Sequence, residues 1–168
     1  MKIEIMSRQE LERHSTNPLT TNTAVISITD FGNDYAELKN FPDFLLQIAF
    51  DDVDNDVFED ELGRPPTKEE RKNIELKYKM YSDDMSISVA EFYFSIIDKV
   101  DVLICQCEHG QSRSAAIASA ILEYRGGKGI NIFADDRYYP NKVVFRKTLN
   151  ALKHKGGKND ATIWFGRQ

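Results

Sequence analysis

Eight consecutive residues bring together a thiol, an imidazole, a guanidinium and two hydroxyl groups, in the segment Cys107-Glu-His-Gly-Gln-Ser-Arg113-Ser114. Five residues separate the cysteine from Arg113. A thiolate is a strong nucleophile, and a guanidinium presents a planar fork of donors that matches two oxygens of a phosphate. The spacing alone is a weak signal, because it can arise by chance, so its meaning depends on the elements that flank it.

The flanking residues place this segment between a strand and a helix. Asp101–Cys105 (DVLIC) predicts a short buried strand, and Ala115–Tyr124 (AAIASAILEY) predicts a helix with an apolar face. A loop that opens a helix directs backbone N–H groups and the positive end of the helix dipole at an anion. Gly110 supplies the close backbone approach or positive φ that such a loop needs. The sequence therefore predicts a phosphate site, with Cys107 in its field.

This segment resembles the active-site loop of cysteine-based protein phosphatases, in particular the dual-specificity and atypical tyrosine phosphatase branch. Residues 86–152 match that branch in order and spacing, including Tyr139-Pro140-Asn141 before the last helix. The first half matches more loosely, chiefly through the run FLLQIAFDD that ends at Asp52. The resemblance implies a three-layer, protein tyrosine phosphatase-like α/β fold. It also implies phosphate-monoester hydrolysis through a cysteinyl-phosphate, with phosphotyrosine favoured over phosphoserine and no metal or cofactor.

The resemblance also implies a role for each residue of the site. Cys107 would be the nucleophile, Arg113 the phosphate clamp, and Ser114 a donor that helps the thiolate depart. Asp52 would be the general acid that protonates the leaving oxygen, with Asp51 and Asp54 as alternatives. The phosphoryl oxygens would bind the loop amides, which are those of Glu108, His109, Gly110, Gln111, Ser112 and Arg113.

One position departs from the family pattern. Gln106 directly precedes the nucleophile, where the family usually has a histidine that orders the loop and assists the thiolate. Glutamine donates and accepts hydrogen bonds but carries no charge. Two alternatives to a protein phosphatase stay open: a phospho-binding module with little turnover, and a phosphatase for a nucleotide, an RNA end or a phosphoinositide.

The two cysteines allow other interpretations. Cys105, Cys107 and His109 are ligand types that suit zinc, but a structural site needs a fourth ligand, and alternating strand residues give poor tetrahedral geometry. Cys105 is predicted to be a buried strand residue, with a reversible disulfide to oxidised Cys107 as the alternative. Rhodanese-like sulfur transferases and arsenate reductases also place a thiolate in an anion loop. Rhodaneses rarely carry the Ser-Arg-Ser ending, and arsenate reductases need further resolving thiols.

Composition bounds the class of protein. The 168 residues are 41% hydrophobic, which suits one compact domain. We predict a phosphatase-like domain over residues 1–155, with a charged insertion or flap over 55–85 near the site. Residues 156–168 are predicted to be a C-terminal tail, which is either loose or pinned to the body by Ile163–Phe165.

Charge is distributed unevenly along the chain. The net charge is −5, but residues 1–124 hold 12 basic against 24 acidic residues, while residues 125–168 hold 10 against 3. This pattern is not that of a dedicated nucleic-acid binder. The basic part serves either solubility or the attraction of an anionic substrate. We expect a cytoplasmic monomer, with no membrane or nucleic-acid partner, acting on a phosphorylated protein or another phosphate monoester.

Further elements follow from periodicity and capping signals. Phe44–Phe50 is a nearly continuous apolar run, which predicts a central strand covered on both faces. A twisted sheet of four or five strands with helices on both faces is therefore expected. The remaining predicted elements are the strands Lys2–Met6 and Thr23–Thr29, and the helices Arg8–Arg13, Lys68–Tyr81, Ser86–Lys99 and Asn141–Lys153.

Overall fold

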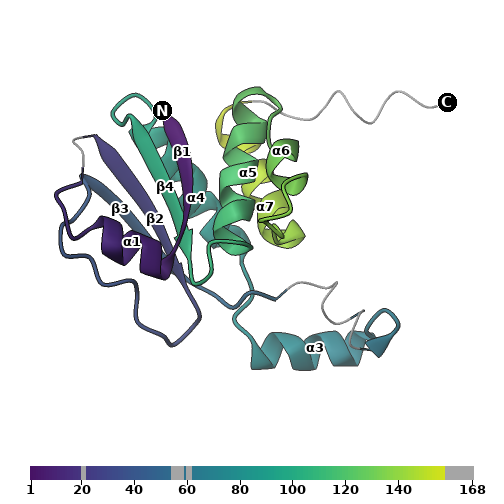
Figure 1. Ribbon diagram of the computed structural model, residues 1–168. Helices are drawn as coiled ribbons and strands as arrows, with labels where there is room; N and C mark the ends of the chain where they lie inside the picture. Colours follow the sequence, from purple (N-terminus) through teal and green to yellow (C-terminus); the bar gives the residue numbers. More distant parts are fainter. Residues whose placement is uncertain (20–21, 54–58, 60–61, 158–168) are drawn as a thin grey trace.

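Four parallel strands form the sheet at the centre of the protein. The computed structural model describes residues 1–19, 22–53, 59 and 62–157 (Figure 1). The strands lie in the order β1-β4-β2-β3, and each neighbouring pair is parallel. Their bounds are β1, Lys2–Ser7; β2, Thr23–Thr29; β3, Phe44–Ala49; and β4, Val102–Cys107. The predicted α/β class is confirmed, with four of the four or five strands expected.

The strand predicted to be central lies at an edge of the sheet. β2 and β4 occupy the two central positions, and β3 is the last strand in the order. Phe44 and Leu46 pack on one apolar cluster and Leu45 on the other, so both faces of β3 are covered. An apolar run indicates that both faces of a strand are covered, but it does not indicate whether the strand has a hydrogen-bonded neighbour on each edge. The prediction of a covered strand is confirmed, and that of a central strand is wrong.

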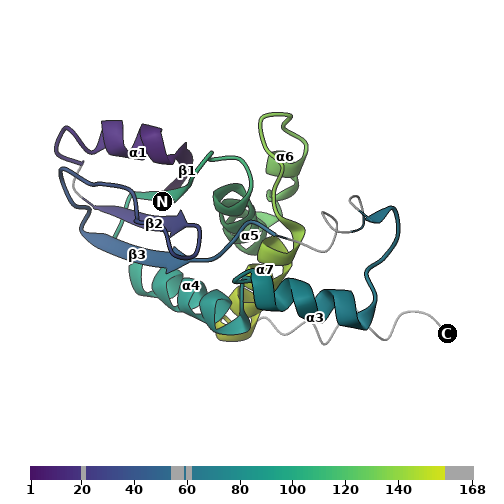
Figure 2. The ribbon, with the colours of Figure 1, turned by 90° about the horizontal axis from the view of Figure 1, so that it is seen from below.

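Helices cover both faces of the sheet, as predicted. On one face, Leu11 of α1 and Leu38 of the loop between β2 and β3 pack against Val25 and Ile104. On the other face, α4 and α5 contact the sheet, and α7 packs against both of them. Figure 2 shows α1 and α4 on opposite sides of the sheet. The bounds are α1, Arg8–His14; α4, Asp83–Ile96; α5, Arg113–Gly126; α6, Ile130–Phe133; and α7, Lys142–Lys155. The short helix α6 was not predicted.

Capping residues fix where several helices start and end. Ser7 and Glu10 form the capping box predicted for α1, and Gly127 ends α5 with a φ of 68°. The helix predicted over Lys68–Tyr81 is shorter: α3 spans Lys68–Lys77. It ends there because the backbone of Lys79 instead pairs with Asp51, beside β3.

The helix α3 lies apart from the core. None of its residues is buried, and Figure 1 shows it extending from the body below α5 and α7. Among the described residues, no helix has the length and apolar character needed to cross a bilayer. The predicted contact of Ile163–Phe165 with the body falls outside the described residues.

Candidate active site

The sequence-predicted nucleophile ends the central strand β4. Cys107 is the last residue of that strand, and its side chain is buried. Its Sγ lies 3.0 Å from the Oγ of Ser114, a fully buried residue in the first turn of α5. A hydroxyl at hydrogen-bond distance can donate to a thiolate and stabilise its charge. The strand and the helix therefore bring together the two predicted groups of the sulfur site.

The start of α5 leaves its amides available. Ser112 is the N-cap residue, yet its side chain makes no capping hydrogen bond. Its Oγ instead donates to Oδ1 of Asp52, at 2.8 Å. The first turn of a helix has N–H groups without helical partners, and these favour an anion. The loop before this 14-residue helix thus has the donors of a phosphate cradle.

At Gly110 the loop passes close to the end of β1. It has a φ of 68°, and a Cβ there would lie 2.6 Å from the backbone N of Ser7 and 2.8 Å from the carbonyl carbon of Met6. Both the left-handed backbone and the contact with the end of β1 therefore exclude a side chain.

We predict that Gly110→Ala lowers kcat/KM on a phosphate ester by about 100-fold, because the loop must shift by a substantial fraction of an ångström. Gly127→Ala is the matched control: the φ is the same 68°, but the nearest atom lies 4.0 Å from the added Cβ. The control should lose some stability in urea unfolding and keep its kcat/KM. Equal kinetics for the two variants would contradict the predicted role of the close approach.

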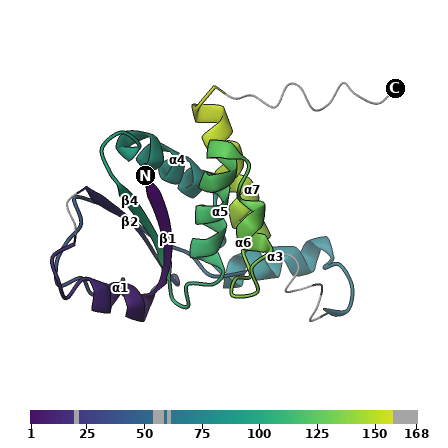
Figure 3. The same cartoon turned by 45° about the horizontal axis from the view of Figure 1, so that its top comes forward.

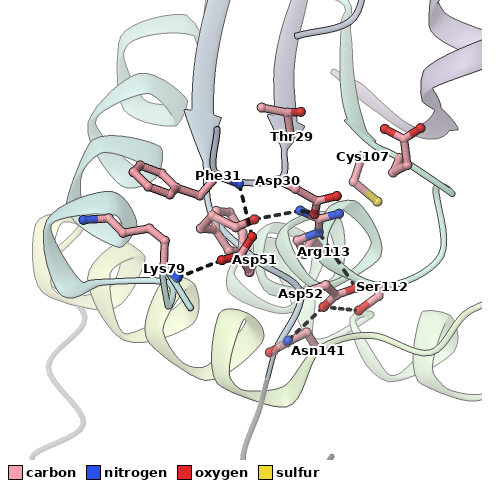
Figure 4. Close-up of polar contacts among 12 residues, drawn as sticks. Thr29, Asp30, Phe31, Asp51, Asp52, Lys79, Cys107, Ser112, Arg113 and Asn141 are labelled. Atoms are coloured by element: carbon pink, nitrogen blue, oxygen red, sulfur yellow. Dashed lines mark hydrogen bonds and ion pairs between the residues drawn. The ribbon is translucent and has the colours of Figure 1, made fainter. Parts of the chain in front are cut away.

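Arg113, the first residue of α5, is a buried cation. The residue is only 3% exposed. Its Nη1 donates to the carbonyl of Phe50 at 2.7 Å and lies 2.6 Å from a carboxylate oxygen of Asp30 (Figure 4). Its Nε is buried and has no hydrogen-bond partner among the described residues. A buried donor without a partner is costly, so this edge of the guanidinium is a place where a bound anion would be stabilised.

The three candidate general acids differ in their surroundings. Asp52 lies at the loop: its Oδ1 accepts from Ser112 and from Nδ2 of Asn141, and its Oδ2 lies 3.8 Å from Nε of Arg113. Asp51 accepts backbone N–H groups from Phe31 and Lys79, so it joins two loops. Asp54 lies outside the described residues. The geometry therefore brings Asp52, of the two described, to the predicted phosphate site.

Contacts from two sides hold the loop in place. Arg8 pairs with the Glu108 side chain at 2.7 Å, and its backbone N–H donates to the Glu108 carbonyl. The carbonyl of Gln111 accepts from the backbone N–H of Tyr139. The side chain of His109 is exposed. Glu108 and Gln111 are thus anchored, one near each end of the loop.

Gln106 and Cys105 both point into the fold. Gln106 is fully buried, and its Oε1 accepts from the hydroxyl of Ser27 on β2 at 2.7 Å. Cys105 belongs to the apolar cluster under α5, and burial raises the pKa of its thiol. Both cysteines are unpaired by disulfides. No group of three or more His, Cys, Asp or Glu side chains with metal-site geometry occurs among the residues that the structure describes.

Sequence reasoning missed Asp30 as a site residue. It follows β2 directly, and the carboxyl ends of parallel strands meet at one edge of a sheet. That rule, applied to the end of each predicted strand, would have selected Asp30 along with Asp52 and Cys107. Asn141 was predicted to open the last helix. It does cap α7 with its Oδ1, and its Nδ2 also holds Asp52.

Comparisons with known proteins found likeness in structure. No protein-family model and no curated protein sequence matches the chain. The structure is similar to that of human DUSP28, with a TM-score of 0.45 and 11% sequence identity, over 94% of this chain and 95% of that chain. It is also similar to that of PTPMT1, with a TM-score of 0.48 and 12% identity, over 94% of this chain and 96% of that chain.

Proposed function

We propose that this protein hydrolyses phosphate monoesters, of the protein tyrosine or dual-specificity type, through a phosphate ester of Cys107. The observation that carries the proposal is the pairing of two groups at one loop. A cysteine sulfur lies 3.0 Å from a serine hydroxyl, and the neighbouring buried arginine has an Nε without a hydrogen-bond partner among the described residues. The uncapped start of α5 adds backbone donors. The resemblance of Cys107–Ser114 to the phosphatase loop supports the same chemistry.

In the first step, the thiolate of Cys107 attacks phosphorus. The sulfur–phosphorus bond forms as the ester oxygen–phosphorus bond breaks. The Nε and Nη2 edge of Arg113 and the loop amides bind the three non-bridging oxygens, whose charge is spread in the transition state. The sulfur is buried, so only a group that enters the loop can reach it.

Asp52 supplies the proton for the leaving oxygen. Its Oδ1 already accepts two hydrogen bonds, which leaves Oδ2 to carry the transferable proton. In the second step, water attacks the phosphocysteine and gives a proton back to Asp52. The sulfur–phosphorus bond then breaks, inorganic phosphate leaves, and the hydroxyl of Ser114 donates to the departing thiolate.

A phospho-binding module with little turnover is the second candidate. Gln106 favours it, because this side chain hydrogen-bonds to Ser27 in the interior and carries no charge that would assist the thiolate. The phosphate cradle itself does not depend on Gln106. Binding would then persist without rapid hydrolysis.

The test is phosphate release from p-nitrophenyl phosphate between about pH 5 and 7.5, with reductant and EDTA present. The proposal expects turnover that tungstate inhibits competitively. Tungstate binding without turnover would support the binding module instead. The absence of both would contradict the two candidates together.

We predict that Asp52→Asn slows hydrolysis of phosphotyrosine peptide by about 100- to 10,000-fold, the usual contribution of a general acid. An aryl phosphate with a strongly acidic leaving group needs little protonation, so its hydrolysis should change far less. Asp51→Asn is the control, since Asp51 binds two backbone N–H groups instead of lying at the loop. Leaving-group dependence in Asp51→Asn rather than Asp52→Asn would reassign the acid.

A further inference from the structure

A groove lies between α3 and α7, next to the loop site. Its volume is about 500 Å³, and residues of α3, of the segment 78–82 and of the first turns of α7 form its walls. Figures 2 and 3 both place α3 beside α7. One wall of the groove is therefore the charged helix α3. No residue of α3 is buried, so this helix is not part of the core.

The groove adjoins segments that hold the proposed active site. Lys79 lines the groove, and its backbone exchanges hydrogen bonds with Asp51, the neighbour of Asp52. Val143 lines it from α7, two residues after Asn141, which holds Asp52. The Nζ of Lys79 also lies 5.9 Å from the centre of the Phe31 ring, next to Asp30. A chain bound in the loop can therefore continue into the groove.

Positive charge dominates the groove. Of the described residues, Arg71, Lys79, Arg146 and Lys147 line it, against one carboxylate, that of Glu75. Lys147 pairs with Asp83 at 3.0 Å. Within the described part of the chain, no carboxylate forms an ion pair with the other three cations. Because the protein as a whole has a net charge of −5, this groove is a local exception.

The groove also offers apolar surface. Ile74, Tyr78 and Met80 line it and are partly buried. A polypeptide can fill such a groove with both carboxylates and apolar side chains, while a small phosphate compound would use its charges only. The mixture therefore favours a peptide chain over a small anion.

We infer that the groove between α3 and α7 binds an acidic stretch of a phosphorylated polypeptide, next to the phosphorylated residue held by the loop. The inference rests on the proposed function for the position of that phosphate. It makes acidic flanking sequence, read by Arg71, Lys79 and Arg146, a determinant of which phosphoprotein is the substrate.

Three phosphotyrosine peptides test this inference: one with neutral flanks, one with acidic residues before the phosphotyrosine, and one with acidic residues after it. At least one acidic peptide should have a kcat/KM roughly tenfold above that of the neutral peptide, with the preference falling as salt is raised. Arg146→Glu should remove the preference and leave p-nitrophenyl phosphate turnover unchanged. Lys72→Glu changes an exposed residue of α3 that does not line the groove, so it is the charge-matched control and should retain the preference.

Equal kcat/KM for all three peptides would overturn the inference, as would an equal loss in the two charge-reversal variants. If the protein preferred a phosphorylated oligonucleotide to the peptides, and this preference depended on Arg146, the groove would bind a nucleic acid and the inference of an acidic polypeptide would be wrong. Binding keeps the test separate from turnover: fluorescence anisotropy of the labelled peptides with Cys107→Ser measures the same preference. If the binding preference depended on Arg146 but the wild-type protein had no turnover, the proposed hydrolysis would be overturned and the groove upheld.

Discussion

Replacing Cys107 by serine is expected to abolish phosphate-ester hydrolysis and to leave the binding of tungstate intact. A serine hydroxyl at this position is neutral and a poor nucleophile. Turnover should therefore fall by about 10⁶-fold, which is the usual loss of kcat when the nucleophile of a covalent mechanism is removed. The groups that bind the anion stay in place. These are the loop amides at the start of α5 and Arg113, whose Nη1 is fixed by Phe50 and Asp30.

Calorimetric titration with tungstate and a p-nitrophenyl phosphate assay on the same preparation measure the two halves of this expectation. Cys105→Ala is the matched control, because it changes the other cysteine of β4, two residues away in the apolar cluster. Its thiol is held protonated by burial, which raises its pKa, so it should contribute packing only. If Cys107→Ser kept its turnover, or if a folded Cys105→Ala lost it, the assignment of the nucleophile to Cys107 would be wrong.

Replacing Arg113 by lysine is expected to weaken both binding and catalysis. Lysine keeps the charge but cannot present two parallel donors to two phosphate oxygens. It also cannot satisfy the Phe50 carbonyl and Asp30 while facing the loop. We expect kcat/KM to fall by about 1,000-fold or more, as when an arginine that stabilises a phosphoryl transition state is removed. Tungstate affinity should fall with it.

Arg137→Lys provides the control for this exchange. Arg137 forms an exposed pair with Asp135 at 2.6 Å, and surface pairs contribute little to stability. Its kinetics should match the wild type. Because Arg113 is buried, thermal unfolding must accompany the assay, so that lost activity is compared among folded proteins only. A folded Arg113→Lys with wild-type tungstate affinity would contradict the phosphate-clamp role.

The core of the site could be predicted because its members are close in sequence. Cys107, Arg113 and Ser114 lie in one segment between a buried strand and an alanine-rich helix, and both elements have strong local signals. A strand followed by a helix brings these side chains together whatever the rest of the sheet does. Gly110 was likewise predictable, since a mid-loop glycine signals positive φ or close approach.

The rest of the site depends on contacts between distant segments. Asp30 forms an ion pair with Arg113 because β2 lies beside β4 in the sheet. The periodicity of a segment does not predict the order of the strands. The same limitation explains why β3 was predicted to be central. The charge asymmetry was visible in the sequence, but only the packing of α3 beside α7 gathers Arg71 and Arg146 into one groove. Neither hydrophobic pattern nor capping signals report such pairings.

The most direct test of the proposed hydrolysis is to trap its covalent intermediate. Wild-type protein would be mixed with a phosphotyrosine peptide labelled with ³²P, quenched in acid within milliseconds, digested, and mapped for the labelled residue. The mechanism predicts label on the peptide that contains Cys107, released by iodine as expected for a sulfur–phosphorus bond, and no label in Cys107→Ser. Rapid turnover with no labelled protein, or with label on another residue, would contradict hydrolysis through a cysteinyl-phosphate.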